Sequence, residues 1–470
     1  MSLLNEAHAL APVLTELRHS LHREPELGLD LPLTQAKVIA ALAELGLEIT
    51  SGRALSSVTA VLRGGRPGPA VLLRGDMDAL PVHEDSGVAY ASAIDGRMHA
   101  CGHDLHTAGL VGAAHLLAAR REQLAGDVVL MFQPGEEGQG GARIMIDEGV
   151  LDAAGERVVA AYALHVVSRG APAGFAATRP GPVLAASDTV HVTVRGVGGH
   201  GSSPHAAVDP VPALCTMVTA LQTLVTREID IFDPAVVTIG RLEAGTAPNV
   251  IPESGRFSAT VRTFSDASRA AVRTAFERTV HGIAAAHRVS ADIDYVHQYP
   301  PTVNHDGETA FAIETARDVL GEDRVFLAPT PLAGSEDFSF VLREVPGAFL
   351  GLGACPAGTD PTTAPMNHSP QAVYDDAALP HAAALLAGLA LRRLAPATSG
   401  PSDRPSSASS DPSSSAPSVT SDSSAPSAPS DSSVTSDGSS APSVTSDDSS
   451  APSVTSDSSV GSPVSSSSQE

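Results

Sequence analysis

Short runs of valine, leucine and alanine alternate with helical patterns along the first part of this chain. Each run is too short for a helix and ends in glycine or a charged residue, as a strand buried on both faces does. Strands that alternate with helices predict a largely parallel sheet covered by helices on both sides. The predicted strands are 58–63, 70–73, 128–132 and 159–164, and the predicted helices are 6–21, 35–45, 107–121 and 141–148.

The pattern changes after Gly181. Residues 188–195 alternate polar and apolar side chains, which indicates a strand with one face in water. Similar strands and two helices follow until Pro300, where the first pattern resumes. We therefore predict an α/β fold in which an α+β domain, 183–299, is inserted into a discontinuous domain formed by residues 1–182 and 300–396.

The last segment, residues 397–470, is nearly all Ser, Pro, Ala, Thr, Val, Asp and Gly. The octamer Ser-Ala-Pro-Ser-Val-Thr-Ser-Asp occurs in it three times. Leucine, isoleucine and aromatic residues are absent, so ordering this segment would cost chain entropy with no burial to offset it. The sequence therefore predicts a disordered tail, which carries nine acidic residues and one arginine.

Charge and cysteine usage exclude several classes of protein. The formal net charge of the 470 residues is −24, and about two thirds of it lies outside the tail, which argues against general nucleic-acid binding. No apolar run reaches membrane-spanning length, and the N-terminus lacks the basic-then-apolar order of a secretory signal. Three cysteines make no disulfide framework. We expect a cytoplasmic protein that binds neither nucleic acid nor membrane.

Residues 98–106 bring one thiol, one carboxylate and three imidazoles together within nine positions. Cys101 and His103 are two residues apart, and thiolate and neutral imidazole are preferred ligands of borderline-soft divalent metals. Asp104 is placed to accept a hydrogen bond from a ligating histidine. The alternative is a polar loop with a buried free cysteine, because Cys-x-His is a weaker signal than paired Cys-x-x-Cys motifs.

Two pairs of acids follow predicted strands. Asp76 and Asp78 project to the same side if the backbone is extended, although a solvated turn is the alternative. Glu136 and Glu137 are adjacent, and their carboxylates repel each other unless a cation or a shared proton lies nearby. One glutamate as metal ligand and the other as proton-transfer group would satisfy this requirement.

Two further histidines, His165 after an apolar strand and His368 in a loop, would more often be structural if each stood alone. In an open α/β sheet, however, the carboxyl ends of the strands share one edge, so we expect a common site. The order Asp-x-Asp, Cys-x-His-Asp, Glu-Glu, Leu-His and Asn-His-Ser resembles the M20 metallopeptidase superfamily. Within it, the chain is similar to the aminoacylase-like amidohydrolases, which include hippurate hydrolases, auxin-conjugate hydrolases and N-acyl-L-amino acid amidohydrolases. The resemblance begins near residue 17 and ends near residue 394.

This resemblance implies a dinuclear site for two divalent metal ions, which for such a donor set are Zn, Mn, Co or Ni. It implies that Glu136 is the general base for a metal-activated water and that Asp78 orients the site. In this branch, Asp76 stands where other members place a histidine ligand. The implied metal ligands are Cys101, His103, Glu137, His165 and His368.

The resemblance also assigns a role to the inserted domain, as a lid and dimerisation domain of a homodimer or dimer of dimers. His200, in a glycine-rich stretch, would bind the carbonyl oxygen of the substrate, often from the partner subunit in relatives. Asn249 and Arg262 resemble substrate contacts, and Arg262 suits a carboxylate. Glu336 resembles a residue of the pocket floor. For His200, a flexible surface loop is the alternative.

The leading hypothesis is a metal-dependent amidohydrolase that cleaves N-acyl amino acids to a carboxylate and a free amino acid. A dipeptidase or aminopeptidase of the M20 type is the alternative within the hydrolases. A metal-binding protein without turnover is a third interpretation, although a pure binder needs no base beside its ligands. A cysteine hydrolase with Cys101 as nucleophile, and His103 or His106 as base, is a fourth.

Overall fold

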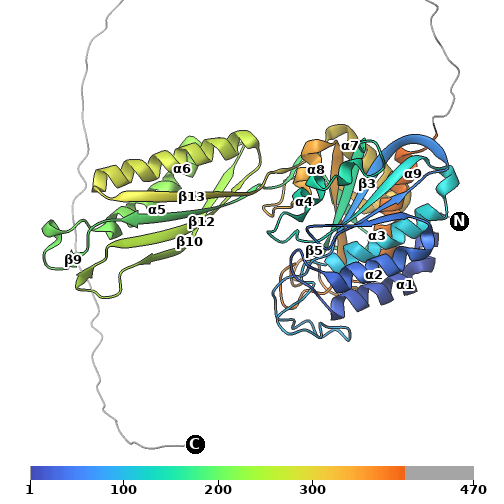
Figure 1. Cartoon of the computed structure of the whole chain (residues 1–470), viewed down its shortest axis with the longest axis horizontal. Coiled ribbons are helices and arrows are strands. Elements are labelled where there is room, and N and C mark those ends of the chain that lie inside the picture. The colour runs from blue at the N-terminus through green and yellow to red at the C-terminus, as the bar shows by residue number, and fades with distance from the viewer. Residues whose placement is uncertain (1, 397–470) are drawn as a thin grey trace, which may run out of the picture. The chain divides into compact units, whose positions relative to one another are not determined.

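The computed structural model describes residues 2–396, and its largest element is an eight-stranded sheet (Figure 1). The strand order is β1-β2-β4-β3-β5-β16-β6-β15, and the four central strands β4, β3, β5 and β16 are mutually parallel. The mostly parallel α/β fold expected from the sequence is therefore confirmed. The strands are β1 (Glu48–Ser51), β2 (Val58–Leu62), β3 (Arg66–Asp76), β4 (Ala125–Gln133), β5 (Ala160–Pro172), β6 (Ala176–Thr178), β15 (Val325–Leu327) and β16 (Gly347–Cys355).

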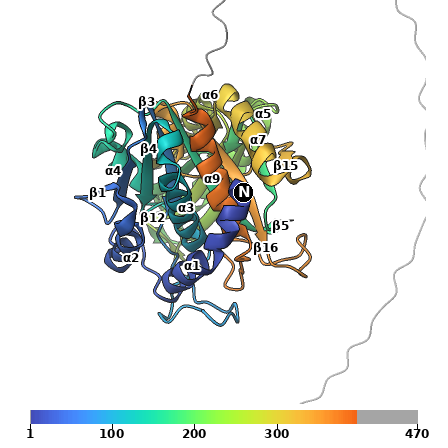
Figure 2. The ribbon, with the colours of Figure 1, turned by 90° about the vertical axis from the view of Figure 1, so that its right-hand side faces the viewer.

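Helices pack on both faces of this sheet, as Figure 2 shows from the side. Along β3, Val71 and Leu73 join a buried cluster under one set of helices, whereas Leu72 joins the cluster on the opposite face. Burial on both faces explains why the strands read as continuous apolar runs. The first set is α1 (Leu3–Arg23), α2 (Pro32–Leu42), α3 (His103–Ala118), α7 (Asp306–Leu320) and α9 (Ala378–Arg393), and the second is α4 (Gly141–Asp147) and α8 (Ser339–Glu344).

A separate four-stranded antiparallel sheet is formed by residues that lie, in the sequence, between the first and the last strands of the large sheet. Its strand order is β10-β12-β8-β13. Val190, Val192 and Val194 on β8 are fully buried, whereas His191 between them is exposed, which matches the predicted alternation. The elements are β8 (Ser187–Arg195), α5 (Pro210–Glu228), β10 (Ala235–Ala244), β12 (Ser254–Thr263), α6 (Asp266–His287) and β13 (Ser290–Tyr299). The predicted domain boundaries, 182/183 and 299/300, stay predictions.

Two short ribbons complete the described strands: β9 (Gly199–His200) pairs with β11 (Val250–Ile251), and β7 (Gly181–Leu184) pairs with β14 (Thr302–Asn304). The tail predicted for residues 397–470 lies outside the described residues. Among the helices that are described, none combines the length and the apolar character needed to cross a bilayer.

Two of the local differences between expectation and structure bear on the site. The helix predicted to begin at residue 107 begins at His103, because Gly102 takes a left-handed conformation and starts the first turn there. His165 does not follow its strand but lies within β5, which continues to Pro172. The extension pairs with β16, where His165 is the register partner of Gly351.

Candidate functional site

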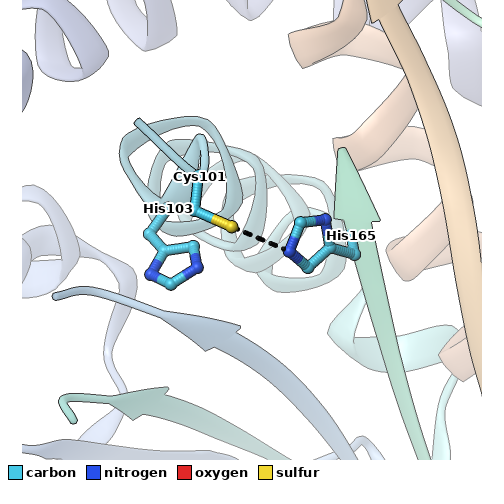
Figure 3. A group of neighbouring side chains, drawn as sticks. All are labelled: Cys101, His103 and His165. Carbon is cyan, nitrogen blue, oxygen red and sulfur yellow. Dashed lines mark hydrogen bonds between the residues drawn. The ribbon is translucent and has the colours of Figure 1, made fainter. Parts of the chain in front are cut away.

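Side chains from four separate segments converge beside the carboxyl end of β3. The Cys101 Sγ atom lies 3.3 Å from Nε2 of His165 and 3.3 Å from Nε2 of His368. Glu137 Oε1 lies 3.2 Å from the same His368 nitrogen. Figure 3 shows Cys101, His103 and His165, with the thiol directed toward His165. The five residues expected as metal ligands are thus brought together.

The donor atoms form small groups in which all ligand atoms lie within 4.8 Å of one another. One group contains Cys101, His103 and His165, and a second contains Cys101, Glu137 and His368. Both groups share the Cys101 thiol. Thiolate, imidazole and carboxylate in such proximity are the donors that a borderline-soft divalent ion prefers.

The turn before α3 sets the spacing of the first two donors. Gly102 has φ +82°, and a Cβ atom there would lie 2.5 Å from Val166 and 3.0 Å from the Tyr374 ring. Only glycine combines this backbone conformation with so close an approach. Cys101 and His103 therefore flank a position that no side chain can occupy.

His103 shows directly that the site fits a cation. Its Nδ1 atom is 2.8 Å from the backbone carbonyl oxygen of Asp78, so this nitrogen carries the proton and donates. Its Nε2 atom is buried and hydrogen-bonds to no described residue, with Asp76 Oδ2 at 3.4 Å. A buried ring nitrogen with a free lone pair, fixed by a bond at the opposite nitrogen, is the usual arrangement of a ligating histidine.

Asp78 holds the loop that carries the two glutamates. Its Oδ1 accepts from the backbone N–H of Glu136, and its Oδ2 accepts from that of Glu137, both at 3.0 Å. Asp78 is 1% exposed, so these bonds are shielded from water. The carboxylate thus fixes the backbone from which both glutamate side chains project, and its orienting role in the site stays a prediction.

Glu136 lies beside the donors without bonding to them. A carboxylate oxygen lies within 4.8 Å of ligand atoms of His103 and Glu137, and the carboxylate hydrogen-bonds to none of the described residues. Glu136 is 6% exposed. Burial, and next the carboxylates of Glu336 and Glu137, raise the pKa of Glu136 well above its ordinary value. This position suits a group that takes up and returns a proton.

The electrostatics of the cluster favour positive charge. Burial opposes ionisation of the Cys101 thiol, yet His165 and His103 hold its pKa well below the ordinary value. Burial alone would lower the pKa of His165, but the neighbouring Cys101 thiolate raises it to about 9. Hydrogen bonds to Cys101 and Glu137 raise the pKa of His368 to about 10. Protons or metal ions are therefore stabilised at these donors.

A second buried layer, missed by the sequence reasoning, supports the first. His106 Nδ1 lies 2.5 Å from Asp76 Oδ1, while its Nε2 accepts from the backbone N–H of Val166, next to His165. Asp76 also pairs with Arg74 at 2.7 Å. The spacing of Cys101, His103 and His106 hinted at a role for His106, but no local pattern indicated its partner.

Arg74 forms ion pairs with two adjacent acids, Glu336 and Asp337. Its guanidinium pairs with Glu336 at 2.8 Å and with Asp337 at 3.2 Å, and all three side chains are buried. Glu336 also accepts from the backbone N–H of Phe338. It therefore bonds to Arg74 and to backbone rather than to a predicted metal ligand.

The loop of His368 is fixed from both sides. His368 has φ +71°, a left-handed conformation uncommon for histidine, and its backbone N–H donates to the Ala100 carbonyl at 2.8 Å. The neighbouring Asn367 side chain donates to the Val166 carbonyl at 3.0 Å and accepts from the Ser168 N–H at 3.0 Å. These bonds hold the His368 ring against Cys101.

The three residues expected to contact substrate lie in the antiparallel sheet and its short ribbon. His200 is exposed, and the Asn249 carbonyl accepts from the Gly201 N–H beside it. Arg262, half-buried on β12, donates to the Ser187 hydroxyl. Among the described residues, no hydrogen bond or ion pair joins these three side chains to the donor cluster, so their roles stay predictions.

Comparisons with known proteins agree with this geometry. The family model for peptidase family M20/M25/M40 matches residues 72–392. An IAA-amino acid hydrolase ILR1-like 4 from Arabidopsis thaliana is 38% identical over 382 residues, which are 80% of this chain and 85% of the relative. An N-acetylcysteine deacetylase from Bacillus subtilis is 36% identical, over 80% of this chain and 96% of the relative.

A third relative and a solved structure extend the comparison. A thermostable carboxypeptidase 2 from Saccharolobus solfataricus is 35% identical, over 75% of this chain and 88% of its own. The crystal structure of Bacillus subtilis YXEP, described as a dinuclear metal binding peptidase from the M20 family, superposes with a TM-score of 0.71 at 33% identity. It covers 82% of this chain and 99% of YXEP. Because the family model matches most of the chain and relatives above 30% identity span most of its length, this protein is a member of the M20/M25/M40 peptidase family.

Proposed function

We propose that this hydrolase is a metal-dependent amidohydrolase that cleaves the amide bond of N-acyl amino acids to a carboxylate and a free amino acid. The observation that carries the proposal is the convergence of a thiol, three imidazoles and Glu137 beside the unbonded carboxylate of Glu136. The names of two relatives, an IAA-amino acid hydrolase and an N-acetylcysteine deacetylase, support this substrate class.

The donor set suits two divalent ions, of Zn, Mn, Co or Ni. The ligands would be Cys101, His103, Glu137, His165 and His368, and YXEP, a relative described as dinuclear, supports two ions. When bound, such ions lower the pKa of a coordinated water and polarise the carbonyl of an amide.

The residues of the chain supply the proton transfers. Glu136 takes a proton from the attacking water while the water oxygen forms a bond to the amide carbon. Glu136 then gives this proton to the departing nitrogen as the carbon–nitrogen bond breaks, which yields a carboxylic acid and an amine. The acid passes its remaining proton to the more basic amine, so the final products are a carboxylate and an ammonium group. Asp78 keeps Glu136 and Glu137 in place through their backbone N–H groups.

His200, Asn249 and Arg262 are proposed to bind the carbonyl and the carboxylate of the substrate. Their distance in sequence from the donors, and the exposure of His200 and Asn249, are compatible with contact from the partner subunit of a homodimer. The dimer and the cytoplasmic location remain part of the proposal.

A peptidase activity is the second candidate, because one relative is described as a carboxypeptidase. The substrates of the two candidates differ on the acyl side of the cleaved amide bond. A dipeptide carries a free amine there, whereas an N-acyl amino acid does not. A substrate panel separates them.

The experiment compares N-acetyl, N-benzoyl and indole-acyl amino acids with matched dipeptides. The protein is stripped with a chelator, dialysed and reloaded with Zn, Mn, Co or Ni in parallel. We expect hydrolysis of N-acyl amino acids that disappears on chelation and returns with a divalent ion. Preferential release of amino acids from dipeptides would favour the peptidase. Activity that survives chelation would point to a thiol enzyme, and bound metal without turnover would point to a binding protein.

A further inference from the structure

Tyr299 stands where the chain leaves the antiparallel sheet. It is the last residue of β13 and the register partner of Ser187, the first residue of β8. Pro300 follows it, which restricts the Tyr299 backbone to extended conformations. The chain then enters β14, which pairs with β7. The backbone of Tyr299 is therefore restrained by strand pairing and by Pro300, and its side chain projects from the connection between the two sheets.

The hydroxyl of Tyr299 reaches the loop of the proposed general base. It donates to the backbone carbonyl of Glu136 at 2.7 Å and accepts from the backbone N–H of Gly140 at 3.0 Å. The ring packs edge-on against Phe340, with centroids 6.0 Å apart. Tyr299 is 5% exposed, so water does not compete strongly for these bonds.

The bond from Tyr299 completes the restraint on one peptide unit. In the peptide between Glu136 and Glu137, the N–H donates to Asp78 and the C=O accepts from Tyr299. Within the turn, the Glu136 C=O also accepts from the Gly138 N–H at 2.7 Å, and the Gly135 C=O accepts from the Gly141 N–H at 3.1 Å. Gly135, Gly138 and Gly140 adopt positive φ and carry no side chains that could pack, so Asp78 and Tyr299 supply the side-chain bonds to the backbone described for residues 136–140. The position of the Glu136 carboxylate, which bonds to no described residue, therefore depends on its backbone.

We propose that Tyr299 is a positioning residue for the general base, which ties the turn of residues 136–140 to the connection between the two sheets. The inference rests on the proposed function, in which Glu136 moves the proton. Tyr299 touches neither the donor atoms nor Glu136's carboxylate, and it acts through the Glu136 backbone.

The same strand offers a matched control. Tyr295 also lies on β13, is half-buried, and has a hydroxyl that hydrogen-bonds to none of the described residues. Tyr295→Phe removes the same atom from the same strand without changing a bond to the loop. Tyr299→Phe removes the two bonds to the loop and leaves the ring against Phe340.

The experiment measures kcat, KM, metal content and melting temperature for the full chain, for Tyr299→Phe and Tyr295→Phe, and for Glu136→Gln as reference. We expect Tyr299→Phe to lower kcat by about 10- to 100-fold, the cost of a misplaced reacting group. We expect KM within about twofold and bound metal unchanged, because Asp78 still holds Glu137. In the double variant Tyr299→Phe/Glu136→Gln, measured alongside, loss of the Tyr299 bonds should lower kcat little further than Glu136→Gln alone does.

Each result decides between the proposals. Equal kinetics for Tyr299→Phe and Tyr295→Phe, with Glu136→Gln inactive, would overturn the role of Tyr299 and leave the proposed function intact. Loss of metal or of folded protein in Tyr299→Phe, sufficient to explain its lower activity, would also overturn it, because the role would then be structural. Full activity of Glu136→Gln would instead overturn the proposed mechanism, and with it the inference about Tyr299.

Discussion

Cys101 Sγ and His165 Nε2 lie 3.3 Å apart, although 64 positions separate the two residues in the chain. Cys101 stands in the turn before α3, and His165 stands within the central strand β5. The thiol belongs to two groups of donor atoms, Cys101–His103–His165 and Cys101–Glu137–His368, so a change at this sulfur alters both sets of proposed ligands.

Replacing Cys101 should therefore weaken metal binding more than any change outside the donor set. We expect Cys101→Ser to lower metal affinity by more than about 100-fold, since loss of an outer-shell partner alone costs roughly 10- to 100-fold. Competition with a chromophoric chelator measures the affinity. Cys215→Ser, at an exposed position on α5, is the control and should bind metal normally. Equal affinities for the two variants would contradict the assignment of Cys101.

Glu136→Gln should separate catalysis from metal binding. The amide cannot accept a proton, so we expect kcat to fall by about 10²- to 10⁴-fold while metal content stays unchanged. Stopped assays of product amine, together with metal analysis, give both quantities. Glu148→Gln is the matched control, because Glu148 accepts bonds from the backbone N–H groups of Arg53 and Ala54, pairs with the Arg53 guanidinium at 3.9 Å, and belongs to none of the donor groups. A Glu136→Gln variant that loses its metal would identify Glu136 as a ligand instead.

Removal of the Asp78 carboxylate should destabilise the protein. Asp78→Ala leaves the backbone N–H groups of Glu136 and Glu137 without an acceptor, at about 1–3 kcal/mol each. We expect the free energy of unfolding of the metal-free protein to fall by about 2–6 kcal/mol in urea titrations. Asp78→Asn retains one acceptor oxygen, so its free energy of unfolding should lie between those of the unchanged protein and Asp78→Ala. Asp95 pairs with His83 at the surface, so Asp95→Ala should change the free energy of unfolding little. A loss as large as that of Asp78→Ala would contradict this explanation.

His22 should make stability depend on pH. Its ring bonds to Asp104 at 2.9 Å and to Glu84 at 3.1 Å. Burial alone would lower the pKa of His22, but Asp104 and then Glu84 raise it to about 9 from 6.5. Because folding raises this pKa, the stabilisation is fully present below pH 6.5 and is lost as pH rises through about 9.

His22→Phe should therefore reduce the slope of the stability curve between these two pH values, to which the His22 ring contributes up to about 3 kcal/mol of the fall in free energy of unfolding. Denaturant titrations at intervals of half a pH unit measure the slope. His83→Phe, which changes an exposed histidine, should keep the slope of the unchanged protein. Parallel curves for the two variants would exclude His22 as the titrating group.

Much of this fold was predictable because its central strands are buried on both faces. Leu72 and Leu73 pack against opposite helical layers, and this burial leaves an unbroken apolar run in the sequence. A common site was predictable for a related reason, since residues at the carboxyl edge of parallel strands meet, whereas the five donors were implied by the resemblance to the M20 superfamily. The short edge strands β1 and β15 carry few buried side chains, so their sequences gave no signal.

Other parts of the site depend on contacts between distant segments. The Arg74 pairs with Glu336 and Asp337 join positions more than 260 residues apart, and no spacing within either motif indicates them. The same holds for the Tyr299 bond to the Glu136 carbonyl, 163 residues away. The sequence predicts a strand that ends before His165 because this polar residue closes the apolar run 159–164, whereas pairing with β16 continues through Val167.

The contact between Cys101 and His368 spans 267 positions of the chain. During synthesis the thiol therefore leaves the ribosome long before its last histidine partner exists, and any early capture of an ion involves an incomplete donor set. Under the proposed function, the complete donor set therefore forms only once the C-terminal elements have closed the large sheet. The proposed site would then take its ion from those available to the fully folded chain, not from those that the nascent chain meets.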